Sequence, residues 1–208
     1  MKLVKISALA ILSLGFFACG SSEADKAQDD LNNSTNELND ELNNASSADW
    51  KTLSDNSYFE IKVPSHMVVE PSLNADASLQ YAYVEEVGGT VKEHYMIVLM
   101  ETHEEIESYD LDTEFDAASY GEISAENLGT GLDAYEILTK DPEVKSVNGM
   151  DCVRYEMEGA MGDVNVYYEL GVFEGEHAFY QVLTWTILDQ RPEFKGDMDK
   201  IINSFKEK

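Results

Sequence analysis

Basic residues are scarce in this sequence. The 208 residues include 14 Lys and Arg against 41 Asp and Glu, which gives a formal net charge of −27 at pH 7. Nucleic acids are bound by clustered Lys and Arg that displace phosphate counterions, and the sequence contains no basic patch. We therefore exclude nucleic acid as a partner. The same deficit disfavours binding to anionic lipid headgroups through surface charge.

The sequence also lacks a hydrophobic run long enough to span a bilayer. Its longest apolar stretch, residues 6–17, follows Lys2 and Lys5 and is twelve residues long. As a helix this stretch would measure about 18 Å, whereas the hydrocarbon core of a bilayer is about 30 Å thick. A short apolar run behind a basic start is typical of a secretory signal, which we place at residues 1–18.

Ala18 precedes Cys19, and here the chain resembles the bacterial lipoprotein family. In that family a small residue before a cysteine marks signal removal, and the cysteine becomes the lipidated first residue. Phe16 departs from the family's commonest pattern, which has leucine three places before the cysteine. The resemblance implies a lipid anchor at Cys19, and the alternative is an ordinary cleaved signal followed by an incidental cysteine. Gly20 is not the aspartate that retains many such proteins at an inner membrane, which favours the outer membrane.

Cysteine is nearly absent after the signal, where the two cysteines of the sequence are Cys19 and Cys152. If a lipid occupies Cys19, no intrachain disulfide is possible, although the extracytoplasmic compartment would permit one. Cys152 stands at the head of a strand pattern, where a small buried hydrophobic residue is the commoner role than a reactive thiol. Removal of the signal leaves 12 basic and 41 acidic residues, a net charge of −29.

Residues 19–48 differ in composition from the rest of the chain. The stretch after Cys19 contains six Asn, seven acidic residues and one Lys, with almost no large apolar residues. Such a segment cannot bury enough surface to offset its ordering entropy, so we predict a disordered tether. An alternative is one weak amphipathic helix through Leu31, Leu38 and Leu42.

Catalytic motifs are missing as well. The sequence has no Gly-x-Ser-x-Gly elbow, no GxGxxG motif and no phosphate-binding loop. His103 and Glu107 stand four apart, as metal ligands do on a helix, but the zinc protease pattern requires histidine at both positions. We therefore predict a solvated acidic loop here.

The following acidic stretch resembles a calcium loop only in part. Asp110, Asp112 and Glu114 alternate as calcium ligands do, but Phe115 occupies the sixth place, where the loop requires glycine, and Gly121 the twelfth, where it requires glutamate. These residues are weak candidates for metal ligands, and we predict neither a metal nor a cofactor.

Residues 49–208 are long enough for one hydrophobic core, and we predict a single domain. Alternating or continuous apolar residues predict strands at 58–64, 79–85, 91–101, 134–139, 143–147, 152–158, 164–173 and 177–187. Gly88 and Gly89 predict a hairpin turn, and the last three strands predict a meander. A helix is expected from a cap at Thr113 to Gly129, and a second from Pro192 through Phe205.

This order implies an α+β domain with a mainly antiparallel sheet. The chain resembles the PsbP-like fold family in residues 59–64 (FEIKVP), 147–155 (VNGMDCVRY, with Gly149 before a strand), 164–187 (paired strands) and 201–205 (IINSF). The resemblance implies a sandwich with helices on both faces of the sheet. It also implies a binding or accessory module with no shared catalytic residues.

Together these observations predict a membrane-anchored lipoprotein of the cell envelope that binds a protein partner and is not an enzyme. Two alternatives come from other classes. The tyrosines and Trp185 could line a pocket, which would make the protein a carrier of an apolar or lipid ligand. The acidic stretch could instead serve a divalent-metal-dependent hydrolase.

The anchor can be tested directly. Cys19→Ser should release the protein from membranes or leave its signal unprocessed, because no later stretch is apolar enough to hold it there. Detergent phase partitioning measures this, with Cys152→Ser as the matched control that should stay in the detergent phase. A wild-type mature protein found in the aqueous phase would disprove the anchor.

Overall fold

The structure is a computed structural model that describes residues 49–55, 58–108 and 115–208. The predicted signal, Cys19 and the predicted tether lie outside the described residues. The elements in chain order are β1 (Trp50–Asp55), β2 (Phe59–Pro64), β3 (Val68–Val69), β4 (Leu79–Val87), β5 (Thr90–Thr102), α2 (His103–Glu107), α3 (Ala117–Thr130), β6 (Ala134–Ile137), β7 (Lys145–Val147), β8 (Met150–Met161), β9 (Val164–Glu174), β10 (Ala178–Ile187), the 3₁₀ helix η1 (Leu188–Gln190), α4 (Arg191–Ser204) and β11 (Lys206–Glu207).

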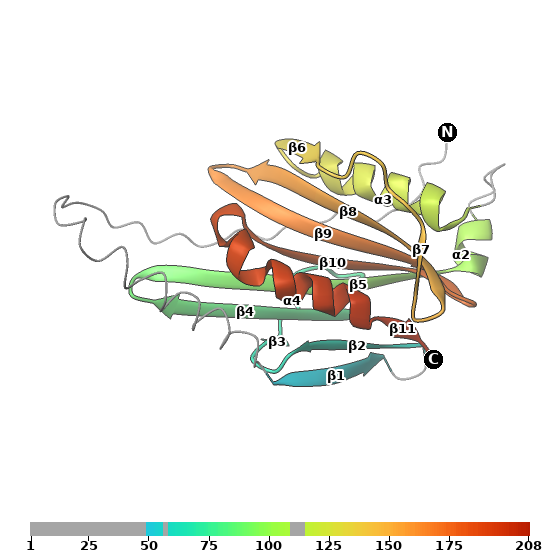
Figure 1. Ribbon diagram of the computed structural model, residues 1–208, viewed down its shortest axis with the longest axis horizontal. Coiled ribbons are helices and arrows are strands. Elements are labelled where there is room, and N and C mark those ends of the chain that lie inside the picture. The colour runs from blue at the N-terminus through green and yellow to red at the C-terminus, as the bar shows by residue number, and fades with distance from the viewer. Residues whose placement is uncertain (1–48, 56–57, 109–114) are drawn as a thin grey trace.

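All strand pairs of the described residues are antiparallel, and the strands form two sheets. The larger sheet has the order β3-β4-β5-β10-β9-β8-β6, with β7 also paired to β8, and its long strands twist and curl (Figure 1). The smaller sheet has the order β1-β2-β11. The predicted α+β class with an antiparallel sheet is therefore confirmed.

The predicted hairpin and meander are both present. β4 and β5 are joined at Gly88 and Gly89, whose φ angles of +60° and +83° suit glycine. β5 lies between β4 and β10, and its residues 96–98 have no exposed surface. A run that is apolar on both sides of the strand suits such a position inside the sheet.

Side chains of β10 alternate between two core clusters. Phe179 and Leu183 belong to a cluster that includes Tyr120 and Leu128 of α3. Ala178, Tyr180 and Val182 belong to another cluster, with Ile201 and Ile202 of α4 and with Phe205. α3 packs on β8, β9 and β10, whereas α4 packs on β2, β9 and β10.

The helices differ from prediction at their ends. α3 begins after Asp116, whose Oδ1 accepts a hydrogen bond from the amide of Ser119 at 2.8 Å. The predicted cap, Thr113, lies outside the described residues. α4 ends at Ser204, and Phe205 is extended but fully buried. Within the described part of the chain, no helix combines the length and the apolar character needed to cross a membrane.

Five short elements were not predicted: β1, β3, α2, η1 and β11. β1 has one buried side chain, Leu53, so its sequence shows no alternation. β11 has two residues, Lys206 and Glu207, which pair with Glu60 and Phe59, almost 150 positions earlier in the sequence. Such pairings depend on residues far away in the sequence and leave no local pattern.

Truncation of Ile201 tests whether α4 belongs to the core. Ile201 is fully buried, so Ile201→Ala should lower the free energy of unfolding by about 2–5 kcal/mol, as core truncations do. Urea unfolding provides the measurement. The neighbouring exposed Lys200→Ala is the control and should change this free energy by less than about 0.5 kcal/mol. Equal, small effects of both changes would mean that α4 is peripheral.

Candidate functional site

The sequence-derived metal candidates are not brought together in the described part of the chain. His103 and Glu107 both lie in the short helix α2. His103 Nε2 donates to the carbonyl oxygen of Gly175 at 3.0 Å, and its ring packs edge-on against Phe179. His103 therefore serves packing. Among residues 49–55, 58–108 and 115–208, no three His, Cys, Asp or Glu side chains are arranged to hold a metal ion.

Asp110, Asp112 and Glu114 lie outside the described residues. The expected loop over residues 103–107 is wrong, because these residues form a helix. Thr102 caps it, and the Glu105 carboxylate accepts a hydrogen bond from the backbone amide of Thr102 at 2.8 Å. This capping box stabilises a single helical turn that the acidic composition did not reveal.

His94 and Cys152, the two side chains here that could take part in nucleophilic catalysis, are both buried. His94 Nε2 lies 2.7 Å from Thr184 Oγ1, but neither residue has exposed surface that a substrate could reach. Burial lowers the pKa of His94 to about 3, so its imidazole is neutral at pH 7. Burial raises the pKa of Cys152 to about 12, which leaves a neutral thiol and agrees with its predicted role as a small buried residue.

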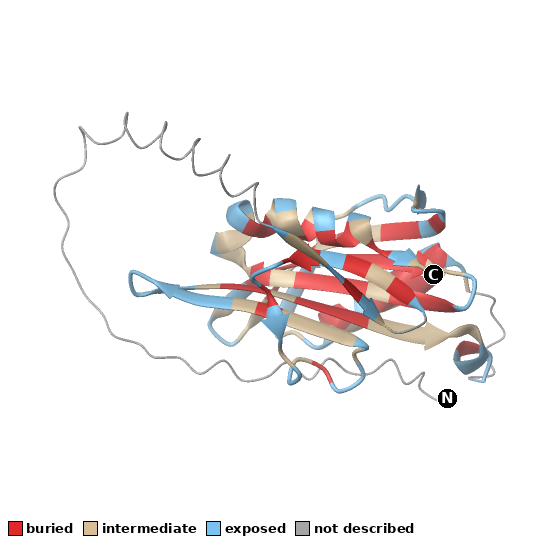
Figure 2. Cartoon of the chain, turned by 90° about the horizontal axis from the view of Figure 1, so that it is seen from below, coloured by how far each residue is buried: buried red, intermediate tan, exposed pale blue. Residues whose placement is uncertain are grey.

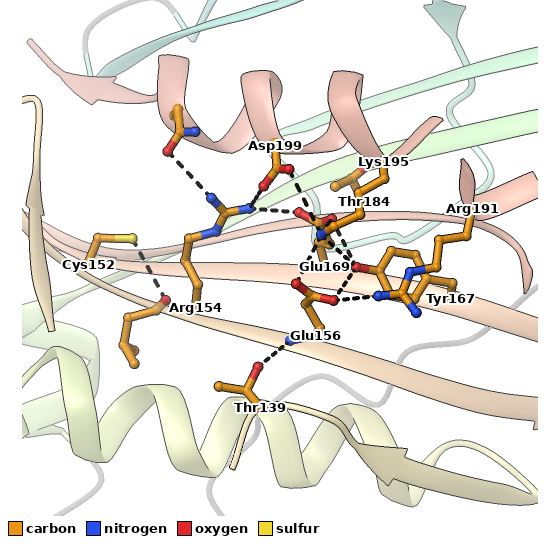
Figure 3. A network of polar contacts seen from close by, with 12 residues as sticks. Thr139, Cys152, Arg154, Glu156, Tyr167, Glu169, Thr184, Arg191, Lys195 and Asp199 are labelled. Atoms are coloured by element: carbon orange, nitrogen blue, oxygen red, sulfur yellow. Dashed lines mark hydrogen bonds and ion pairs between the residues drawn. The ribbon is translucent and has the colours of Figure 1, made fainter. Parts of the chain in front are cut away.

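A network of charged side chains joins α4 to β8 and β9 (Figure 3). We call it the α4 ionic cluster, and its members are Arg154, Glu156, Tyr167, Glu169, Arg191, Lys195 and Asp199. The α4 members stand four apart, so they share one side of the helix. The members within each strand stand two apart, so they share one face of the sheet.

Glu169 lies at the centre of the cluster. Its side chain is 1% exposed, and its two oxygens lie 2.9 Å from Lys195 Nζ and 2.7 Å from Arg154 Nη2. Arg154 Nη2 also lies 2.6 Å from Asp199 Oδ1. The one fully buried carboxylate of the cluster is thus paired on both sides.

Glu156 is held in a similar way. Lys195 Nζ lies 2.9 Å from one of its oxygens, and Arg191 Nη2 lies 2.8 Å from the other. The Arg191 guanidinium also lies over the ring of Tyr167, 4.2 Å from its centroid, and the Tyr167 hydroxyl donates to Glu156 at 2.8 Å. Every cation of the cluster therefore contacts at least one carboxylate.

The pKa values of the two glutamates shift in opposite directions. Burial raises the pKa of Glu169 and outweighs the opposing effect of Lys195 and Arg154. Burial also acts to raise the pKa of Glu156, but hydrogen bonds from Lys195 and Tyr167 lower it overall. Two carboxyl groups whose pKa values are shifted in opposite directions can serve as the acid and the base of a catalytic site. Here Glu169 is inaccessible to a substrate and Glu156 is neutralised by two cations, so the pair is poorly suited to proton transfer.

A hollow of about 340 Å³ lies beside the cluster, and we call it the first hollow. Cys152 lines it together with Thr139, and its charged lining residues are Asp141, Glu143, Lys145, Arg154, Glu156 and Asp199. Four acidic and two basic residues give this lining a negative balance. The first hollow therefore favours a ligand group that is positively charged or a hydrogen-bond donor.

The sequence reasoning missed this cluster, although one signal was available. Arg154 and Arg191 are the only two arginines of the chain, and both belong to the cluster. In a chain so poor in basic residues, the few arginines are good candidates for buried ion pairs, which suit the guanidinium group.

Comparisons with known proteins give a likeness of fold. No protein-family model matches the sequence, and no curated protein is significantly similar to it. Among solved structures, LpqN, involved in cell envelope biogenesis of Mycobacterium tuberculosis, matches with a TM-score of 0.50 and 10% identity over 76% of this chain and 90% of that chain. PsbP of the cyanobacterium Synechocystis sp. PCC 6803 matches with a TM-score of 0.48 and 13% identity over 77% of this chain and 94% of that chain. A Pseudomonas aeruginosa protein of unknown function, PA94, has a TM-score of 0.46 and 11% identity over 75% of this chain and 94% of that chain.

At these identities the matches concern the fold alone. The match to LpqN, with a TM-score of 0.50, shows that the two proteins have a similar fold.

Replacement of Lys195 tests whether the α4 ionic cluster stabilises the domain. Lys195→Met leaves the buried Glu169 with one cation, and we expect a loss of about 1–3 kcal/mol in the free energy of unfolding. Adding Glu169→Gln should recover part of this loss, with a coupling energy of about 1 kcal/mol or more in a double-mutant cycle.

The control is Lys92→Met. Lys92 is as exposed as Lys195 (36% and 34%), but its partner Glu193 is 42% exposed, so its loss should change the free energy of unfolding by less than about 0.5 kcal/mol. Equal effects at the two lysines, or strict additivity in the cycle, would refute a cooperative cluster.

Proposed function

We propose that this chain is a lipid-anchored protein of the cell envelope whose domain binds a protein partner and catalyses no reaction. Cys19 carries the lipid after removal of residues 1–18, and residues 19–48 tether the domain, residues 49–208, to the membrane on its extracytoplasmic side. The outer membrane is favoured over the inner by Gly20. LpqN, which has a similar fold, is described as involved in cell envelope biogenesis, and this supports the proposed setting.

The pairing within the α4 ionic cluster is the observation that carries the non-catalytic part of the proposal. Its cations and carboxylates neutralise one another, and the Cys152 thiol beside it is neutral and buried. A site of this kind can recognise a ligand by shape, hydrogen bonds and residual charge. It offers no activated nucleophile and no accessible base.

In this proposal the protein partner binds the surface beside α4. In this proposal α3 and α4 cover opposite faces of the larger sheet, which is supported by the alternation along β9, where Val172 packs with the α3 residues and Phe173 with the α4 residues. Sheet faces covered in this way leave little room for an enclosed ligand. The carrier alternative needs an apolar cavity, whereas the first hollow is lined by six charged residues.

Charge indicates the chemistry of the partner. Acidic residues outnumber basic ones by 41 to 14, and the first hollow has the same negative balance. A partner with a basic docking surface would be steered towards the domain, and rising salt would slow this association by screening it.

Site-specific photocrosslinking in native membranes tests the proposal. A photoreactive phenylalanine analogue replaces Pro142, at the rim of the first hollow, in the full-length protein. We expect a discrete crosslinked protein whose yield falls several-fold between about 0.05 and 0.5 M salt, where the Debye length shortens severalfold.

The same analogue at Glu126, an exposed residue of α3, is the matched control and should give no such product. Identical products from both positions would contradict recognition at the first hollow. Turnover of hydrolase substrates by the purified protein, abolished by a chelator, would replace this proposal by the enzyme alternative.

A further inference from the structure

A second hollow, of about 320 Å³, adjoins the first at the end of α4. Asn203 lines both hollows. The other polar residues that line the second hollow include Glu60, Lys62, Asn148, Ser204 and Lys206. Each hollow is within the roughly 300–1,000 Å³ that is usual for ligand pockets, and we call the two hollows, which share Asn203 as a lining residue, the groove.

The walls of this groove are held by hydrogen bonds. Asn148, in the β7–β8 turn, has a positive φ of 52°, and its Nδ2 donates to the carbonyl oxygens of Asn203 at 3.0 Å and Phe205 at 2.7 Å. On the other side, the amide of Lys62 donates to Ser204 Oγ at 2.8 Å. The turn, β2 and the end of α4 are thereby fixed relative to one another, so the groove is preformed.

The two hollows have opposite residual charge. In the first, Glu143 pairs with Lys145, and Glu156 and Asp199 pair within the α4 ionic cluster. Among the residues that the structure describes, Asp141 has no ion-pair partner.

In the second hollow, Lys206 pairs with Glu60 at 2.9 Å, whereas Lys62 has no ion-pair partner within the described ranges. One uncompensated acid and one uncompensated base thus remain, in adjoining hollows, with Asn203 between them.

Asn203 supplies a group suited to a peptide backbone. Its Oδ1 accepts from Arg154 Nη1 at 3.5 Å, which directs the carbonyl side of the amide towards the first hollow. Its Nδ2 donates to no group in the described part of the chain and can therefore donate to a peptide carbonyl. In an extended peptide, residues two apart point to the same side, about 6.5–7 Å from each other.

We propose that this groove binds an extended segment of the protein partner, with a basic side chain in the first hollow and an acidic side chain two residues away in the second. Asn203 holds the backbone between them, so the segment lies in one direction only. The inference rests on the proposed function and specifies its partner as a segment of mixed charge rather than a uniformly basic surface.

Two fluorescein-labelled peptides of equal composition, acetyl-Ala-Lys-Ala-Glu-Ala-amide and acetyl-Ala-Glu-Ala-Lys-Ala-amide, are the probes. Fluorescence anisotropy with the full mature protein in detergent should show that one order binds about tenfold more tightly than the other, a difference that a few exposed ion contacts can supply. The charge swap Asp141→Lys with Lys62→Glu should reverse this preference. Asn203→Ala should weaken the preferred order more than the other, because the constraint on the direction of the segment is lost.

The matched control is Asp163→Lys with Lys92→Glu, which makes the same exchange of charge away from both hollows and should keep the wild-type preference. Equal binding of the two orders to the wild type, or an unchanged preference after the Asp141 and Lys62 swap, would overturn the inference. Crosslinking from position 142 without any order preference would leave the proposed function standing and reject the peptide groove. An order preference without a membrane crosslink would support the peptide groove and count against the proposed function.

Discussion

The contact between α4 and the larger sheet is the interaction on which the rest of the domain depends. Gly171 of β9 lies opposite Ile202, and a Cβ atom at position 171 would be 2.5 Å from Ile202 Cγ2, so the helix packs directly on the strand backbone. Along the same helix, side chains four residues apart meet polar residues of β8 and β9 (Figure 3). A rotation of α4 would break both sets of contacts. We infer that the ionic cluster fixes this rotation, a role better supported for buried ion pairs than added stability.

The sequence predicted those parts of the fold that leave a local pattern. β2, β8, β9 and β10 show alternating or continuous apolar residues, and at least half of the residues of each strand are buried. Figure 2 shows buried residues along the strands of the domain, whereas the tip of its projecting hairpin is exposed. β1 was missed because it buries one side chain, and β11 was missed because it forms by pairing with β2, which is far away in the sequence. The start of α3 was missed because Asp116 and Ser119 bond to each other, a pairing that the preceding acidic run obscured.

The candidate site was largely hidden from sequence reasoning. Its residues come from β8, β9 and α4, and pairs such as Arg154 and Asp199 become neighbours through the fold alone. By contrast, His103 and Glu107 stand four apart in sequence and are therefore conspicuous, but they lie in one short helix, in which His103 packs on Phe179. Cys152 was interpreted correctly because a thiol within a strand pattern has a strong local bias towards burial.

The charge of this chain acts at long range, where it attracts a partner, and at short range, where individual charges can discriminate between partners. At long range the net charge of −27 attracts any basic protein, but at physiological salt this attraction fades over a Debye length of about 8 Å. At short range, Arg154 and Lys195 pair with the buried Glu169, and Arg191 pairs with the partly exposed Glu156. A field of one sign cannot distinguish one basic partner from another. Discrimination must therefore come from the few charges whose positions the fold fixes, and the residues around the end of α4 meet that condition because helix, strand and turn are bonded together there.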